Sequence, residues 1–565
     1  MVREKLRKLI EDTIKELQKE GIFPNFEIPE IPIEKPAEKI YGDYSTNIAL
    51  QLARFVQKSP TEIANALILK SASRASRSFE KIEQKSGFIN FFISPGYLQK
   101  KVEAILNQKE KFGNLNLGKG KKVNVEFISA NPTGPLTLGN GRGGFGGDVL
   151  ANVLLKVGYK VTGEYYINDA GEQVRKLGHS ILGDDEAVYK GDYILDLRKR
   201  LKEKTCPSGV PLSGTKEDVM KLGKKAADLI LKEMIMPTVK KMGIKFDKWF
   251  YESELYKSGE VPKNLDYLKK KKLAYEKDGA LWFKSTEFGD DKDRVLIKAD
   301  GEKTYLASDV AYLKNKFKRG FKKLIYVWGA DHYGYIGRIK AAAEALGYEK
   351  GFIDIIIMQL VRLFENGKEV RMSKRTGTYV TLDELIKEVG LDVARFFFLT
   401  RSPDSHLNFN LDLAKEQSEK NPVYYIQYAY ARICSILKKS KLKNPTYAKD
   451  LAGKQNSPKQ NLRFATGQAK LNLKLLTHLS ELELLKQLIR LPEIVEDTAK
   501  DYQVQRIPNY AFELAAVFHQ FYTKCRVIDE KNKSLSEARL ALVFAAKTVL
   551  ENTLDLMRIS APEKM

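Results

Sequence analysis

Cysteine is scarce in this sequence, and its scarcity excludes several kinds of protein. Only three cysteines, Cys206, Cys434 and Cys525, occur in 565 residues, and they lie far apart. This spacing argues against a disulfide framework and against a cysteine-based zinc site. Because disulfides persist mainly in oxidising compartments, we expect the protein in a reducing cytoplasm.

Long apolar runs are also missing. No stretch approaches the ~20 consecutive apolar residues that a membrane-crossing helix needs. Residues 1–20 alternate charged and apolar side chains at helical spacing and lack the apolar centre of a secretory signal. The sequence therefore predicts a cytoplasmic protein with no membrane partner.

Acidic residues are outnumbered by basic ones. The chain has 96 Lys and Arg against 72 Asp and Glu, which gives a net charge of +24. Such an excess favours a polyanionic partner. A lysine-rich solvated surface is the alternative, and charge alone does not separate the two.

Hydrophobic periodicity divides the chain into three regions. Residues 1–112 mix helical and strand patterns and indicate a separate N-terminal α/β domain. Residues 118–388 alternate strands with helices, which predicts a Rossmann-like parallel sheet, with a lysine-rich, mainly helical insertion at about 172–292. Residues 390–565 repeat apolar side chains at helical spacing and predict a C-terminal helical bundle. The strands expected in the central region are 123–129, 161–168, 323–328 and 353–359.

A strand, a glycine-rich loop and a helix start follow one another from Val123 to Asp148. The sequence is VNVEFISANPTGPLTLGNGRGGFGGD, and we expect the helix to begin near Arg142. Glycines let the backbone approach an anion, and the free N–H groups of a helix start favour negative charge. This stretch therefore predicts a phosphate site.

The glycines of this stretch allow more than one interpretation. Gly139, Gly141 and Gly144 fit the G-x-G-x-x-G fingerprint of dinucleotide binding, with Glu164 as the ribose-binding acid. The fingerprint, however, needs a tight turn directly after the strand, and about ten residues intervene here. A glycine-rich connection that binds nothing is a further alternative.

The residues before these glycines give a sharper interpretation. Asn131-Pro-Thr-Gly-Pro-Leu-Thr-Leu-Gly-Asn140 resembles the first signature of class I aminoacyl-tRNA synthetases, in the form of the arginyl-tRNA synthetase family. That signature normally contains His-x-Gly-His, whereas this chain has Thr137-Leu-Gly-Asn140, and none of its five histidines lies in the loop. The resemblance implies catalytic roles for Thr137 and Asn140, and ATP binding at Pro132, Gly134, Gly139 and Gly141.

A second basic segment lies downstream. Arg371-Met-Ser-Lys-Arg-Thr-Gly377 resembles the family's second signature, Lys-Met-Ser-Lys-Ser. Lys374 on a flexible loop can offset the charge that builds up as pyrophosphate leaves, although a basic loop taken alone is more often just solvated. The resemblance implies that Lys374 is catalytic and that Met372 and Ser373 bind ATP.

Between the two signatures, YVWGADH ends an expected strand, where parallel sheets bind ligands. The resemblance implies ATP contacts at Gly329, Asp331 and His332, while a strand-end histidine without such a role remains the alternative for His332.

A site for arginine needs carboxylates that accept the planar guanidinium by paired hydrogen bonds, and an acceptor for the α-ammonium. By motif, Glu126, Asn131, Tyr305 and Asp309 match the family's arginine-binding positions. The spacing of four between Tyr305 and Asp309 places both on one face if the segment is helical. Taken singly, each has a plainer interpretation as a cap, a turn residue or a surface charge.

Two further regions resemble the tRNA-binding parts of the family. GDYSTNIALQLA and GFINFF resemble the N-terminal domain that touches the tRNA elbow, and Asn90 and Phe92 are candidates for a base contact. The C-terminal helices resemble the anticodon-binding bundle, where aromatic side chains beside Lys and Arg suit unstacked bases. Tyr522, Arg526 and Met565 are the candidates there, with core packing as the alternative for all five residues.

The resemblance covers nearly the whole chain and implies an arginine–tRNA ligase. Arginine and ATP, with Mg²⁺, would form arginyl-adenylate, and the arginyl group would pass to the 3′-terminal adenosine of tRNA-Arg. We expect a monomer without a prosthetic group or resident metal. Two alternatives stay open: a non-catalytic tRNA-binding paralogue, suggested by the missing histidines, and a nucleotide-dependent enzyme of another class, such as a dehydrogenase.

Overall fold

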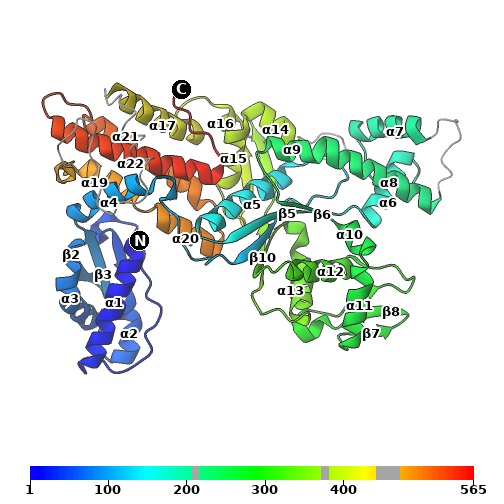
Figure 1. Cartoon of the computed structure of the whole chain (residues 1–565), viewed down its shortest axis with the longest axis horizontal. Coiled ribbons are helices and arrows are strands. Elements are labelled where there is room, and N and C mark those ends of the chain that lie inside the picture. Colours follow the sequence, from blue (N-terminus) through cyan, green and yellow to red (C-terminus); the bar gives the residue numbers. More distant parts are fainter. Residues whose placement is uncertain (206–214, 371–380, 441–470) are drawn as a thin grey trace.

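A computed structural model describes residues 1–205, 215–370, 381–440 and 471–565. The N-terminal domain (blue in Figure 1) lies below one end of the C-terminal helices. The central sheet lies near the middle of the molecule, at the other end of these helices. Among the helices in the described part of the chain, none combines the length and the hydropathy needed to cross a membrane.

The N-terminal domain forms around a small antiparallel sheet. Its elements are α1 (Val2–Lys19), β1 (Tyr44–Thr46), α2 (Ile48–Val56), α3 (Pro60–Ala75), β2 (Phe79–Lys85), β3 (Phe88–Ile93) and α4 (Pro95–Gln108). The strand order is β1-β3-β2. Helix α1 buries Leu6 and Ile10 on one face, as its apolar spacing predicts. Ser59 caps α3: its Oγ accepts a hydrogen bond from the Glu62 N–H over 3.2 Å.

A five-stranded parallel sheet forms the centre of the molecule. Its strands are β4 (Lys122–Glu126), β5 (Lys160–Ile167), β6 (Lys248–Tyr251), β10 (Lys323–Gly329) and β11 (Ile353–Met358), in the order β11-β10-β4-β5-β6. Helices α5 (Leu138–Lys156), α12 (Tyr305–Lys318) and α13 (Ile336–Ala345) lie in its connections. All four strand pairs are parallel, which is the topology expected for strands joined by crossover helices. This sheet confirms the predicted Rossmann-like fold class.

Strand β6 is the sheet strand that we did not predict from the sequence. It lies inside the stretch 172–292, so that stretch is not wholly an insertion outside the sheet. Strand β6 has only four residues, too few to show a strand period. The other elements of the stretch and its end are α6 (Glu172–Leu182), α7 (Asp192–Thr205), α8 (Lys216–Ile230), α9 (Met236–Lys241), α10 (Glu252–Lys257), α11 (Glu260–Lys270), β7 (Ala274–Lys277), β8 (Ala280–Phe283) and β9 (Arg294–Ile297).

Helix α5 begins at Leu138, earlier than the expected start near Arg142. The glycine run therefore lies inside a helix rather than in a loop. A Cβ on Gly147 would lie 2.4 Å from the Phe127 ring, so this glycine lets α5 pack closely on the sheet. Glu164 lies within β5, fully buried, where it is bound by Arg319 rather than facing a ribose site. The dinucleotide-binding interpretation is therefore wrong.

The C-terminal part is mainly helical, as predicted. Arg395 joins it to the catalytic domain: its guanidinium donates to Asp148 Oδ2 of α5 and to the Met557 carbonyl, each over 2.8 Å. The remaining elements are β12 (Val361–Glu365), β13 (Lys368–Val370), α14 (Leu382–Val389), α15 (Leu391–Leu399), β14 (Leu407–Asn410), α16 (Leu411–Lys415), α17 (Pro422–Lys439), α19 (Leu479–Leu488), α20 (Leu491–Asp501), α21 (Arg506–Lys524) and α22 (Lys533–Met557).

Candidate active site

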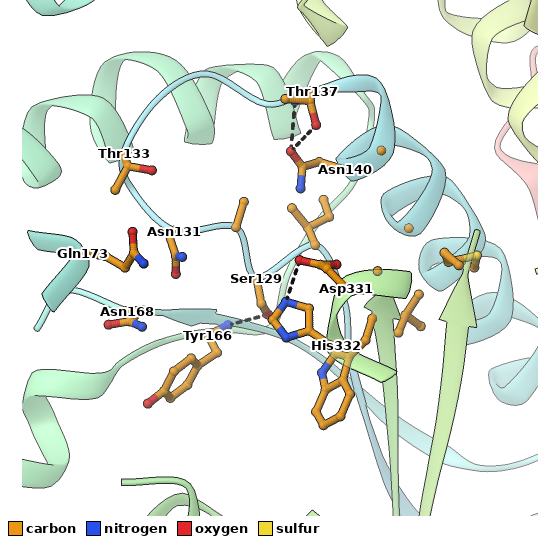
Figure 2. Close-up of a pocket in the computed structure, with 18 of the residues that line it drawn as sticks. Ser129, Asn131, Thr133, Thr137, Asn140, Tyr166, Asn168, Gln173, Asp331 and His332 are labelled. Carbon is orange, nitrogen blue, oxygen red and sulfur yellow. Dashed lines mark hydrogen bonds and ion pairs between the residues drawn. The ribbon is translucent and has the colours of Figure 1, made fainter. Parts of the chain in front are cut away.

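A cavity of about 1380 Å³ lies at the carboxyl ends of β4, β5 and β10, where parallel sheets bind ligands. The loop after β4, the start of α5 and the cavity side of α12 form much of its wall. Figure 2 shows Asn131, Asn140 and Asp331 around the same space. The sequence-predicted residues that line it are Glu126, Asn131, Gly134, Thr137, Gly139, Asn140, Tyr305, Asp309, Gly329, Asp331 and His332.

Two predicted residues, Pro132 and Gly141, do not line the cavity. Pro132 belongs to the loop after β4, and its side chain is buried. Gly141 faces α14, where an added Cβ would lie 2.7 Å from Leu382 Cδ1. Met372, Ser373 and Lys374 lie outside the described residues.

The loop after β4 begins with a sharp and strained turn. Ile128 and Ser129 have φ values of 65° and 38°, which are uncommon for residues other than glycine. The Ser129 Oγ accepts a hydrogen bond from the Tyr166 N–H over 3.1 Å and so fixes this turn against β5. The turn brings Ser129 and Asn131 to the cavity wall (Figure 2). Backbone strain of this kind concentrates at functional sites.

Thr137 and Asn140 occupy the first turn of α5. The Thr137 N–H and the Thr137 hydroxyl both donate to Asn140 Oδ1, each over 2.9 Å (Figure 2). Regular helical hydrogen bonding begins only at Gly141, whose N–H donates to the Thr137 carbonyl over 3.1 Å. The N–H groups at the start of a helix are left without helical partners, so this turn presents donors to an anion.

The start of α14, with the residue before it, is hydrogen-bonded to this same turn. The Leu382 N–H donates to the Leu136 carbonyl over 3.0 Å, and Thr381 forms an antiparallel bridge with Thr137. Thr381, the first described residue after position 380, therefore lies beside Thr137 at the cavity wall.

Three carboxylates gather on the opposite side of the cavity. Glu126 ends β4, Glu252 begins α10, and Asp309 lies one turn after Tyr305 on α12. Burial raises the pKa of Glu252 to about 7. Burial, together with the charges of Glu252 and Glu126, raises the pKa of Asp309 to about 8. A cationic ligand bound beside Glu252 and Asp309 would favour their ionised form, so this pocket suits a cation.

A buried network of hydrogen bonds and ion pairs lies next to this acidic pocket and includes Glu126. Lys316, fully buried, donates to Glu126 Oε2 over 2.6 Å. Arg319 donates twice to Glu164, over 2.6 and 2.8 Å. Burial alone would raise the pKa of Glu164, but the charges of Lys316 and Arg319 hold it below its usual value. The Tyr312 hydroxyl lies 3.0 Å from Glu126 Oε2 and 2.5 Å from Glu164 Oε1, and so connects the two pairs.

The end of β10 forms a third wall. Gly329 allows a close approach here, because a Cβ would lie 2.6 Å from Asp331 Oδ1. The imidazole Nε2 of His332 lies 3.5 Å from Asp331 Oδ2, and both side chains are exposed to the cavity mouth. The Trp328 ring lies 6.0 Å from the His332 ring. This wall offers aromatic faces and a carboxylate, which suit a nucleoside.

Several residues of the cavity, and Lys316 of the buried network beside it, were not found from the sequence. Glu252 directly follows the unpredicted strand β6, so recognising that strand would have exposed it as a candidate. Tyr312 and Lys316 continue the helical spacing of Tyr305 and Asp309, a signal that could have found them. Tyr193, whose hydroxyl donates to the Thr133 carbonyl over 2.9 Å, comes from the helical insertion, whose placement had no sequence signal.

The two N-terminal candidates for tRNA binding differ in their surroundings. Asn90 is 1% exposed, and its Oδ1 accepts from the Ser45 hydroxyl over 2.7 Å. Phe92 is half-buried, with Lys81 Nζ 5.0 Å from its ring centroid. Phe92 therefore lies closer to the surface than Asn90.

The C-terminal candidates lie on exposed parts of the helical region. Tyr522, on α21, is 38% exposed and Met565 is 51% exposed, and Arg526 is also exposed. The Arg432 guanidinium on α17 lies 5.3 Å from the Tyr522 ring and 5.4 Å from the Tyr428 ring. An exposed aromatic surface beside a cation suits base stacking.

The match to a known catalytic domain defines the class of protein. Residues 101–404 match the family model described as tRNA synthetases class I (R), catalytic domain. Residues 4–93 match the arginyl tRNA synthetase N terminal domain, and residues 426–565 match the DALR anticodon binding domain. The sheet, the cavity and these matches make the protein a class I aminoacyl-tRNA synthetase.

Similarity over the full length identifies the family. The chain is 44% identical to arginine–tRNA ligase 1 of Halalkalibacterium halodurans over 99% of both chains. It is 43% identical to the arginine–tRNA ligase of Bacillus subtilis over 100% of both. The fold matches the arginyl-tRNA synthetase of Thermus thermophilus with a TM-score of 0.76 over 100% of both chains, at 20% identity. The chain belongs to the arginyl-tRNA synthetase family.

Proposed function

We propose that the chain joins arginine to tRNA-Arg in two steps at this cavity. One observation carries the proposal: a single cavity connects three carboxylates, Glu126, Glu252 and Asp309, with the first turn of α5. A cationic amino acid and a triphosphate can therefore meet there. The full-length relatives are arginine–tRNA ligases, and none of these findings favours a non-catalytic paralogue.

The acidic pocket binds arginine in this proposal. Glu252 and Asp309 accept the guanidinium, whose planar donors match paired carboxylate oxygens. Tyr305, at the pocket mouth, packs against the aliphatic chain. Glu126 and Asn131, next to the start of the loop, accept the α-ammonium. The α-carboxylate then points toward α5, where the nucleotide binds.

ATP binds between α5 and the end of β10. Gly134 and Gly139 leave room for the phosphates, while Gly329, Asp331 and His332 contact the nucleoside. Mg²⁺ enters with ATP, held mainly by the phosphates. Asn140 and Lys374 act on the phosphates, and Thr137 contributes through its hydrogen bonds to Asn140. Met372 and Ser373 belong to the same segment as Lys374. Pro132 and Gly141 support this turn from behind.

The chemistry needs no covalent enzyme intermediate. The arginine carboxylate attacks the α-phosphate of ATP, the bond to the β-phosphate breaks, and pyrophosphate leaves. A ribose hydroxyl of the terminal adenosine then attacks the arginyl carbonyl, and AMP leaves. The protein contributes positioning and stabilisation of developing charge.

Transfer RNA is the macromolecular substrate. Phe92 serves the elbow contact by stacking, with the almost fully buried Asn90 supporting it on β3. Tyr522, Arg526 and Met565 serve the anticodon contact, with stacking from the Tyr522 ring and charge from Arg526. The net charge of +24 supports a polyanionic partner. A monomeric state and a cytoplasmic location stay predictions from the sequence.

Charging of total tRNA with labelled amino acids tests this function. Arginine with ATP should give labelled tRNA, while lysine and glutamine should not. Binding of tRNA without any arginine transfer would overturn the proposed function.

A further inference from the structure

The first turn of α5 differs from the family signature in a way that separates the roles of two residues. The signature normally supplies two imidazoles, whereas Thr137 and Asn140 stand here. These two side chains contact each other, and they lie on the cavity wall beside the exposed Gly139. They therefore act as a pair whose hydrogen bonds decide which of them can reach a substrate.

The directions of these hydrogen bonds follow from chemistry. The Thr137 N–H can only donate, so the atom that it faces must be the carbonyl oxygen of the Asn140 amide. The same oxygen carries no hydrogen, so the Thr137 hydroxyl must donate to it as well. Two donors on one oxygen fix the amide in a single orientation, with Nδ2 on the other side.

A phosphate oxygen accepts hydrogen bonds, and this requirement distinguishes the two residues. The single hydroxyl proton of Thr137 is already used on Asn140. Asn140 Nδ2 has two hydrogens and no hydrogen-bond partner among the residues that the structure describes. Figure 2 shows this nitrogen directed away from Thr137, toward the interior of the cavity.

We infer that the Asn140 amide nitrogen is the side-chain donor to the α-phosphate and that Thr137 is a positioning residue which orients it. This inference rests on the proposed function and corrects the equal roles that the sequence suggested for the two residues. A neutral amide held by two hydrogen bonds replaces an imidazole, and the N–H groups of the helix start supply further donors.

Asn140→Asp separates donation from helix capping. Aspartate keeps the oxygen that accepts from Thr137 and adds negative charge at a helix start, so the melting temperature should not fall. It removes both N–H donors, so ATP–pyrophosphate exchange with arginine and tRNA should slow about 100-fold or more. The KM for arginine should change little, because the arginine pocket lies across the cavity. An exchange rate close to that of the unchanged protein would overturn the inference.

Thr137 variants test the positioning role. Thr137→Ala should slow exchange less than Asn140→Asp does, and Thr137→Ser, which keeps the hydroxyl donor, should restore most of the rate. The double variant should be no slower than Asn140→Asp alone, because Thr137 acts only through the amide. A further, additive loss in the double variant would show that Thr137 contacts substrate independently and would overturn its assignment.

Ser59→Ala is the matched control for capping. Ser59 caps α3 with the same type of hydrogen bonds but lies in the N-terminal domain. Ser59→Ala should lower thermal stability without slowing exchange. A rate loss equal to that of Thr137→Ala would mean that loss of a helix cap alone explains the Thr137 result. That outcome would overturn the positioning role of Thr137. If the unchanged protein shows no exchange, the proposed function fails. If the unchanged protein is active and the variants exchange at the same rate, only the inference about Thr137 and Asn140 fails.

Discussion

Lys316 Nζ lies 2.6 Å from Glu126 Oε2, and the Lys316 side chain is fully buried. The ammonium also lies 4.4 and 4.3 Å from the ring centroids of Tyr312 and Tyr326. A charge of the chain itself therefore compensates Glu126 permanently. Glu252 and Asp309 have no such direct counter-ion at hydrogen-bond distance among the described residues. This difference leaves these two carboxylates for the guanidinium of the substrate.

Lys316→Met should destabilise the catalytic domain by about 3 kcal/mol, because it leaves Glu126 buried without its partner. The double variant Lys316→Met with Glu126→Gln should recover much of this loss, because no unpaired charge remains. Thermal and denaturant unfolding of the single and double variants measure the coupling. Losses that simply add would contradict the compensation described here.

Arginine should bind more tightly as the pH rises from about 6 to about 9. The pKa of Glu252 is raised to about 7 and that of Asp309 to about 8, so both hold protons at low pH and must release them to accept a cation. Calorimetry in buffers of different ionisation enthalpy should detect proton release on binding. A pH-independent affinity without proton release would contradict this assignment.

Glu252→Gln and Asp309→Asn should each raise the KM for arginine about 10- to 100-fold, because a charge-assisted hydrogen bond is replaced by a neutral one. Thermal stability should not fall, since burial already disfavours the ionised form of both groups. Steady-state charging and thermal unfolding check the two effects. Unchanged KM values would place the guanidinium elsewhere.

Tyr522→Ala should raise the KM for tRNA about tenfold, because loss of a stacked aromatic ring costs roughly 1–3 kcal/mol. Tyr522→Phe keeps the stacking face and is the matched control. Charging at varied tRNA concentration distinguishes the two variants. If Tyr522→Phe were as impaired as Tyr522→Ala, the hydroxyl rather than stacking would make the contact.

The sequence predicted most of the catalytic architecture because strand and helix periods are local. Four of the five strands of the parallel sheet, and the shared face of Tyr305 and Asp309 on α12, follow from such patterns. Glu252 was missed because β6 has only four residues, and its place in the sheet depends on distant pairing with β5.

The interpretation of the glycine run shows a different limit. The same residues fit a phosphate loop and a close-packed helix, and the tertiary packing of the glycines, such as Gly147 on Phe127, distinguishes the two. The hydrogen bonds between Thr137 and Asn140 were likewise beyond sequence reasoning, since they depend on where α5 begins.

Charging with arginine and with citrulline tests the central claim most directly, because citrulline replaces the guanidinium by a neutral group of nearly the same shape. If Glu252 and Asp309 bind the positive charge, kcat/KM should be roughly 10⁴-fold higher for arginine than for citrulline. The reason is that a close analogue which leaves buried polar groups unpaired is rejected. Comparable charging of citrulline would contradict recognition by Glu252 and Asp309.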